Sequence, residues 1–118
     1  MIDSENNSAN TEDYIIILTT IAANQKAEQI AGKLVKLNLA ACIQIDKVRS
    51  IYFWKNDICK SSEYRLMIKT ISTNYQNIEN VIRQLSDYDN PQIIQLKLSA
   101  GSNEYLNWIS KSCNKQNQ

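Results

Sequence analysis

The stretch Tyr14-Ile15-Ile16-Ile17-Leu18-Thr19-Thr20 is short, largely β-branched and apolar up to its two threonines. Such a run is typical of a strand covered on both faces, and so of the centre of a sheet. Behind it, Asn24 is a favourable N-cap for a helix. The apolar residues of that helix recur at helical spacing, at Ala27, Ile30, Ala31, Leu34 and Leu37. The ordered chain is therefore predicted to begin with a central strand and an amphipathic helix.

The next segment, residues 41–54, has the pattern of one long strand. Its apolar residues alternate except at Val48, which predicts a bulge near Asp46-Lys47. Lys55-Asn56-Asp57 predicts a turn, because Asn and Asp tolerate the left-handed backbone conformations that hairpins require. Residues 62–71 alternate cleanly and predict the return strand, so the connection is expected to span 55–61.

A second helix and strand follow this hairpin. Thr73-Asn74-Tyr75-Gln76 has the pattern of a capping box, and the helix that it opens is predicted to end before Asp87. Asn90-Pro91 indicates a loop, residues 93–99 alternate as a strand, and residues 103–111 predict a short terminal helix.

The resulting order, β-α-β-β-α-β, predicts an α+β fold. Right-handed crossovers place both main helices on one face of a four-stranded antiparallel sheet, which is the ferredoxin-like sandwich, here with an additional C-terminal helix. The domain is predicted to span residues 14–112. A flexible acidic leader at 1–13 and a flexible polar tail at 113–118 are expected to flank it.

This arrangement leaves one face of the sheet without a helix, although the strand at 14–20 is apolar on both faces. Ile93 and Met67 are predicted to join that open face. An exposed apolar surface is typical of an interface, so a homo-oligomer is expected. Polar residues predicted on the same face would have to pair across it, and these are Glu63, Arg65, Lys69, Gln95 and Lys97.

The composition excludes several classes of protein. The 118 residues include 13 Lys and Arg, 12 Asp and Glu and no His, so the chain can build neither a Ser-His-Asp or Cys-His nucleophile nor a His-based zinc site. Two glycines leave no phosphate-cradling loop, and the basic residues are scattered. We therefore expect no enzyme and no nucleic-acid partner.

Compartment and membrane association can also be predicted from the sequence. No apolar run reaches the roughly 18 residues of a membrane helix, so no membrane partner is expected. The beginning of the chain has no signal-peptide pattern. Cys42, Cys59 and Cys113 show no Cys-x-x-Cys spacing, and an odd cysteine set of this kind predicts a reducing, cytoplasmic location.

Five segments carry a recognisable combination of residues. They are Leu37-Asn38-Leu39-Ala40-Ala41-Cys42, Ser50-Ile51-Tyr52-Phe53-Trp54, the strand from Glu63 to Lys69-Thr70, Tyr88-Asp89-Asn90-Pro91 and Tyr105-Leu106-Asn107-Trp108-Ile109. Together they resemble the CutA family of small divalent-cation tolerance proteins. The resemblance covers nearly all of residues 14–112. It implies a cytoplasmic homotrimer of ferredoxin-like subunits and a link to tolerance of copper and other divalent metal ions.

The resemblance also implies metal-binding positions, and this chain departs from them. The first-strand cysteine of some members corresponds to Thr19, the histidine before the Tyr-x-x-Pro loop to Ser86, and the glutamate after the proline to Gln92. Weak or neutral oxygens of this kind suit copper poorly. Cys42 and Cys59 remain as candidate ligands for copper or another divalent metal ion. The alternative for Cys42 is a small buried apolar residue.

Three further residues, Glu63, Lys69 and Tyr88, match positions that the family keeps polar, and they are candidates for lining a cleft between subunits. The charged pair Glu63 and Lys69 is expected to hold an anion or a metal-bound ligand there, and Trp54 would supply a ring platform. The alternatives are an interface salt bridge, a hydroxyl hydrogen bond and an aromatic subunit contact.

The sequence thus predicts a trimeric, non-enzymatic protein that binds divalent metal ions or takes part in their homeostasis. One alternative is a trimeric nucleotide or small-molecule sensor resembling the P-II proteins, against which the short 55–61 connection argues. Two others are an enzyme that uses the inter-subunit cleft and a structural assembly platform.

Overall fold

The strand predicted at the centre of the sheet has a neighbour on each side. The computed structural model describes residues 13–114. Its elements are β1 (Tyr14–Ile21), α2 (Asn24–Lys36), β2 (Cys42–Trp54), β3 (Asp57–Ile71), a 3-10 turn (Ser72–Asn74), α3 (Tyr75–Leu85), β4 (Ile94–Lys97) and α4 (Asn103–Cys113). The sheet is antiparallel in the order β2-β3-β1-β4. This confirms the α+β fold and the β-α-β-β-α-β order.

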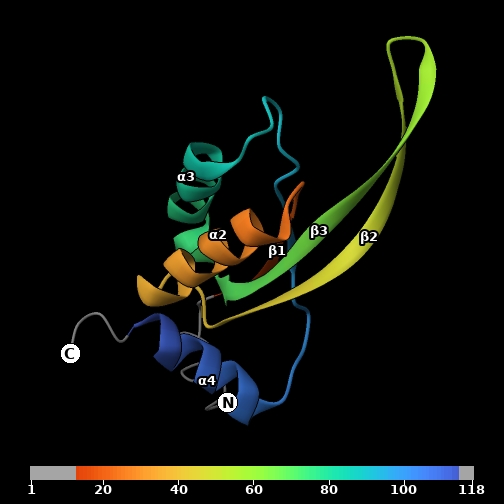
Figure 1. Ribbon diagram of the computed structural model, residues 1–118. Coiled ribbons are helices and arrows are strands. Elements are labelled where there is room, and N and C mark those ends of the chain that lie inside the picture. Colours follow the sequence, from red (N-terminus) through yellow and green to blue (C-terminus); the bar gives the residue numbers. More distant parts are fainter. Residues whose placement is uncertain (1–12, 115–118) are drawn as a thin grey trace.

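Helices α2 and α3 cover the same face of this sheet (Figure 1). Alternate residues of β1, among them Ile15 and Ile17, point to that face and are fully buried. The helices complete the core with apolar residues at helical spacing, and the buried set is Ala27, Ile30, Leu34, Ile78 and Ile82. No helix between residues 13 and 114 has the length and apolar character that crossing a membrane requires.

Helix α4 packs against the end of the sheet where β3 finishes, away from the hairpin turn. Its last residue shows that the boundary predicted for the tail is wrong. Cys113, placed in the flexible tail, is the last residue of α4 and is buried with Ile109 against Ile71. Its Sγ lies 3.5 Å from Thr70 Oγ1. A cysteine next to polar residues carries no periodic signal, so only this contact shows that the helix continues. Of the predicted leader and tail, residues 1–12 and 115–118 lie outside the described residues.

The β2–β3 hairpin is longer and more regular than predicted. Its register is unbroken from Cys42 opposite Lys69 to Trp54 opposite Asp57, so the predicted bulge is wrong. The turn consists of Lys55 and Asn56 alone, both at positive φ, as a type I′ turn requires. The hairpin projects as an arm beyond the helices (Figure 1). No helix lies over the arm, so neither face of the arm is buried there. The spacing of apolar residues in this part of β2 therefore does not indicate a buried face, and a break in that spacing does not indicate a bulge.

The open face of the sheet is apolar, but strand β4 contributes different residues from those predicted. Ile94 pairs with Leu18 and Leu96 pairs with Ile16, so Ile94 and Leu96 lie on the open face and are about half exposed. Ile93, predicted there, instead packs against the core. We name the residues on this face the apolar strip, and they are Ile16, Leu18, Met67, Ile94 and Leu96.

The polar residues predicted on the open face do not all lie there. Arg65 forms an ion pair with its cross-strand neighbour Asp46, with 2.8 Å between Nη2 and Oδ2. Lys97 and Gln95 lie on the other face of β4, opposite Ile15 and Ile17. The charge of Arg65 beside the apolar strip is therefore already paired, whereas Lys69, opposite Ile16 on the same face, bonds to the Tyr105 hydroxyl instead of a carboxylate.

Both helix starts differ from the predicted caps. The cap of α2 is Ala23, and the side chain of Asn24 bonds instead to Glu28 at 3.3 Å. The α3 cap is Asn74, whose backbone is helical because a 3-10 turn precedes it, so the capping box predicted at Thr73 is wrong. Asn74 instead donates to the backbone oxygen of Leu39 at 3.1 Å, tying α3 to the loop after α2.

Two buried threonines permit a matched test of hydrogen bonding in the core. Thr19 Oγ1 is buried without a hydrogen-bond partner among residues 13–114, whereas Thr70 Oγ1 donates to Leu39 O at 2.6 Å. Valine has nearly the shape of threonine without the hydroxyl. Because an unsatisfied buried hydroxyl costs about 1–3 kcal/mol, Thr19→Val should raise the free energy of unfolding by about 1 kcal/mol. Thr70→Val should lower it, and urea unfolding of both variants measures the contrast.

Candidate functional site

A groove of about 690 Å³ runs between the hairpin and the loop after α3, and Trp54 at the outer end of β2 is among its lining residues. Strand β2 supplies one wall and the loop at 86–92 supplies the other. The lining residues are Thr20, Ser50, Ile51, Tyr52, Trp54, Glu63, Asp87, Tyr88, Asp89, Asn90 and Gln92. This volume lies in the range of small-molecule sites. Three of the four predicted ligand-binding residues, Glu63, Tyr88 and Trp54, therefore line one groove.

Glu63 joins the two walls of the groove. Its carboxylate accepts hydrogen bonds from Ser50 Oγ on β2 and from Tyr88 Oη on the loop, the latter at 2.6 Å. The Thr20 hydroxyl on β1 is a third donor. Only 9% of Glu63 is exposed. Hydroxyl donors from three elements thus converge on one buried carboxylate.

This arrangement keeps Glu63 ionised. Burial by itself raises the pKa of the carboxyl, but the hydrogen bonds from Ser50, Tyr88 and Thr20 outweigh it, and the pKa lies below its usual 4.5. Burial and the bond to Glu63 raise the pKa of Tyr88 well above its usual 10, so this phenol remains a donor. None of the ion pairs among residues 13–114 involves Glu63. Its negative charge is balanced by dipoles alone.

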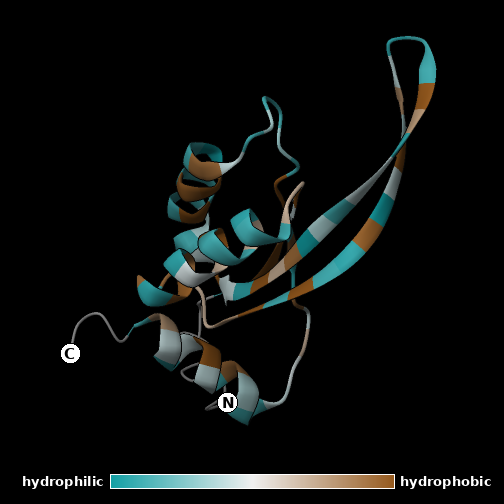
Figure 2. Ribbon diagram, in the orientation of Figure 1, coloured by the Kyte–Doolittle hydropathy of each residue, from teal (hydrophilic) through white to brown (hydrophobic). Residues whose placement is uncertain are grey.

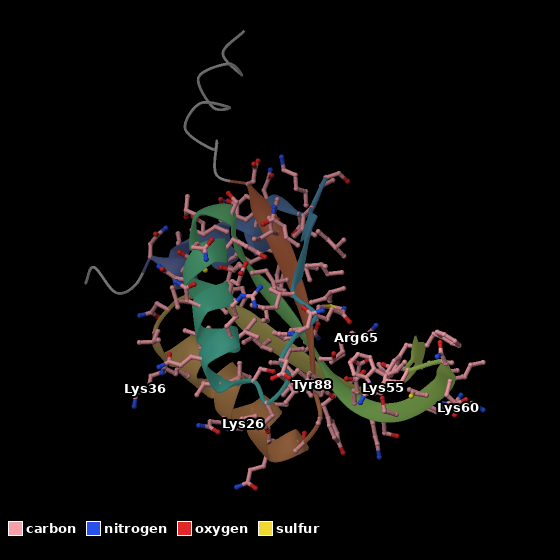
Figure 3. All side chains as sticks on the ribbon, turned by 90° about the horizontal axis from the view of Figure 1, so that it is seen from above. Lys26, Lys36, Lys55, Lys60, Arg65 and Tyr88 are labelled. Atoms are coloured by element: carbon pink, nitrogen blue, oxygen red, sulfur yellow. The ribbon has the colours of Figure 1, made fainter. Side chains whose placement is uncertain are left out.

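The local sequence explains how Tyr88 reaches Glu63. Helix α3 ends at Ser86, whose backbone is extended and whose Oγ accepts from Tyr88 N at 3.2 Å. Pro91 is buried and holds the far end of the loop. Figure 3 shows Tyr88 near the base of the arm, with Lys55 and Lys60 farther out along it. The loop thus presents the phenol towards β3.

The structure places Lys69 away from this groove. Lys69 Nζ donates to Tyr105 Oη on α4 at 3.2 Å and lies 5.4 Å from the centroid of that ring. Glu63 and Lys69 are six residues apart on β3, about 20 Å at the usual rise of a strand. The expected charged pair for holding an anion is therefore not formed within the chain.

The predicted metal-binding residues are also dispersed. Cys42 is half-buried at one end of β2, and Cys59 lies in β3 rather than in a turn, opposite Tyr52. The ten residues of β2 between positions 42 and 52 span roughly 30 Å. Among residues 13–114, no three Cys, Asp or Glu residues lie close enough to hold a metal ion. One chain by itself builds no multidentate metal site in this part of the structure.

The three positions where metal ligands are replaced also fail to converge. Thr19 faces the core, Ser86 caps α3, and only Gln92 lines the groove.

The sequence analysis missed Ser50 and Thr20 as partners of Glu63. Ser50 lies two residues beyond Val48, on the same face of β2, and Val48 is opposite Glu63. An unbroken hairpin register would have placed Ser50 beside the carboxylate, but the bulge predicted at Asp46-Lys47 obscured this. Thr20 gave no signal, because its position relative to β3 depends on the pairing of β1.

The amino-acid sequence is similar to a protein-family model and to characterised proteins. The family model CutA1 divalent ion tolerance protein matches residues 15–112. The divalent-cation tolerance protein CutA of Pectobacterium atrosepticum is 31% identical over 101 residues, covering 85% of this chain and 92% of that protein. The CutA of Thermotoga maritima is 32% identical over 98 residues, covering 83% and 97%.

Solved structures agree with these sequence matches. CutA1 from Shewanella sp. SIB1 superposes with a TM-score of 0.81 at 38% identity, covering 84% of this chain and 94% of that one. The periplasmic divalent cation tolerance protein CutA from Archaeoglobus fulgidus superposes with a TM-score of 0.83 at 27% identity, covering 86% and 99%. Matching sequence, fold and length together show that the chain belongs to the CutA1 divalent ion tolerance protein family.

Proposed function

We propose that this protein acts in tolerance of divalent metal ions, copper among them, as a cytoplasmic, non-enzymatic homotrimer. Membership of the divalent-cation tolerance family supports the metal role. The apolar strip supports the assembly, and it is the observation that carries the proposal. Three copies is the number that the resemblance of the sequence to this family implies.

The apolar strip is suited to contact with other copies of the chain. A half-exposed row of Ile, Leu and Met side chains on a sheet face gains free energy when it is covered. The Arg65–Asp46 pair beside it is already neutralised, which lowers the cost of covering that part of the strip. Farther out, the cross-strand pair Phe53 and Ile58 is 68% and 63% exposed. Hydrophobic residues along the arm are visible in Figure 2.

The dispersed cysteines determine what kind of metal site this proposal allows. Since Cys42 and Cys59 lie far apart in one chain, a metal held by several thiolates needs ligands from more than one copy. A threefold arrangement repeats each cysteine three times around one axis. The expected stoichiometry is therefore one ion per trimer rather than one per chain.

Mass determination followed by metal titration tests the proposal. Light scattering at micromolar concentration should give three times the 13.5 kDa of one chain. Titration with Cu²⁺ and Zn²⁺ should show saturable uptake that is lost in Cys42→Ser or in Cys59→Ser, and Cys113→Ser serves as the control. A stable single chain, or weak uptake that never saturates, would contradict the proposal.

Location and the rival sensor function can be tested separately. Cell fractionation should recover the protein with cytoplasmic markers, while recovery with an exported fraction would agree with the periplasmic name of the Archaeoglobus fulgidus relative. The P-II-like sensor lacks support, since the β2–β3 connection is a two-residue turn and leaves no long loop there to contact a nucleotide.

A further inference from the structure

The charged residues that line the groove beside Glu63 are all acidic. Glu63, Asp87 and Asp89 line it, and within residues 13–114 no Lys or Arg does. The labelled lysines of α2, Lys26 and Lys36, lie on the helical side of the molecule, away from the arm (Figure 3). An anionic ligand would therefore meet uncompensated repulsion here, whereas a cation would be attracted.

Aromatic rings form much of the remaining wall. Tyr52, Trp54 and Tyr88 line the groove, and Trp54 is 59% exposed. The face of an aromatic ring attracts a cation. The structure already contains one such contact at this site, because Lys55 Nζ lies 5.8 Å from the centroid of the Trp54 ring. The groove thus combines carboxylates with a ring that accepts an ammonium group.

A single metal ion fits this groove poorly. A hard divalent cation needs about six oxygen ligands at close range. No three acidic or cysteine side chains in the described part of the chain are gathered tightly enough to chelate an ion. Charges spread around a volume of about 690 Å³ instead match a ligand of several heavy atoms.

Glu63 can also accept a further hydrogen bond from such a ligand. A carboxylate offers about four lone-pair sites, and the hydroxyls of Ser50, Tyr88 and Thr20 occupy three of them. The charge itself has no cationic partner in the described chain. A donor entering from the groove could therefore use the remaining site and neutralise the charge.

We propose that this groove binds an organic cation, an ammonium or amidinium-type group carried on a flat apolar body. The carboxylates of Glu63, Asp87 and Asp89 take the charge, and the rings of Trp54 and Tyr52 take the body. This goes beyond the metal role. Its argument uses side chains of a single chain and draws neither on the trimer nor on metal uptake.

Calorimetry of the full chain with three matched probes tests the charge requirement. Benzamidine, benzamide and benzoate share one flat ring and differ in charge, being positive, neutral and negative. Benzamidine should bind saturably with one molecule per chain, benzamide at least about tenfold more weakly, and benzoate not at all, because only the cation gains from the carboxylates and rings. Raising the salt concentration should weaken the benzamidine complex.

Variants locate the binding to the groove. Trp54→Ala should weaken benzamidine at least about fivefold through loss of the ring contact, and the matched Trp108→Ala, on α4, should leave it unchanged. The double variant Asp87→Asn/Asp89→Asn should also weaken it about fivefold, with Glu104→Gln as the distant control. Circular dichroism confirms that each variant is folded.

Several results would overturn the inference. These are no saturable benzamidine binding, equal binding of benzamide, or equal losses in the Trp54 and Trp108 variants. None of them bears on the mass of the assembly or on uptake of Cu²⁺, so this inference and the proposed function fail independently.

Discussion

A Leu96→Asp variant is expected to sediment as a single 13.5-kDa chain, whereas the unmodified protein is expected to sediment as the proposed trimer. Leu96 lies in the apolar strip and is 49% exposed in the isolated chain. An aspartate there can remain hydrated in the monomer, so folding should be retained. In the assembly the same carboxylate would be buried without a partner, which costs several kcal/mol for each copy. Sedimentation velocity at micromolar concentration, with circular dichroism, measures both effects.

The neighbouring position supplies the control for this prediction. Gln95 is exposed and lies on the opposite face of β4, towards the helices. Gln95→Asp introduces the same charge one residue away and should leave the trimer intact. If both variants stay trimeric, the apolar strip is not the interface. If both dissociate, the effect is one of net charge and not of this face.

Replacing Glu63 with alanine should lower the free energy of unfolding by about 2–4 kcal/mol at pH 7, because hydrogen bonds to a charged group contribute about 1.5–3 kcal/mol each. The change leaves the hydroxyls of Ser50 and Tyr88 without their acceptor and opens a hole between β2, β3 and the loop. Glu63→Gln keeps the volume but loses the charge, so it should be destabilised less. Urea unfolding at pH 7 compares the two variants.

The same carboxylate should also make stability depend on pH. Its folded pKa lies below the ordinary value of 4.5, so its contribution is fully present above pH 4.5 and is lost as the pH falls through the folded pKa. Below pH 4.5, the unfolding free energy of the unmodified protein should therefore fall more steeply than that of Glu63→Gln. At neutral pH the difference between the two should be constant.

A surface carboxylate separates this effect from the loss of any negative charge. Glu28 lies on the exposed side of α2, where its carboxylate accepts only the Asn24 amide at 3.3 Å. Glu28→Gln should change stability by less than about 0.5 kcal/mol, as surface substitutions do. Parallel acid unfolding curves for the unmodified protein and Glu63→Gln would show that Glu63 does not carry the pH dependence.

The site could be predicted in part because some of its residues have local signals. Glu63 and Tyr88 stand out as polar residues in segments with a recognisable pattern, and the structure brings them within hydrogen-bond distance. Lys69 has an equally strong signal but bonds to Tyr105. What a strand residue faces beyond its own sheet depends on which element packs there, and this is not encoded in its periodicity.

Local patterns in the chain were enough to establish the identity and order of the elements. The run at 14–20, the helical spacing that follows it and the alternation at 62–71 are local patterns that reflect burial on one side or both. They were sufficient for the central strand, the hairpin and the β-α-β-β-α-β order. Local periodicity reports whether a residue is covered, and for these elements the core does the covering.

The register of the strands and the face on which each residue lies depend on contacts between distant segments. A shift of one residue exchanges the two faces of a strand, and pairing with β1 placed Ile94 and Leu96, rather than Ile93, on the open side. The arm beyond the helices kept an unbroken ladder although its apolar pattern suggested a bulge. Cys113 is buried for a similar reason, since its contact with Ile71 joins positions far apart in the chain. These features depend on which segments meet in space, and no single segment carries that information.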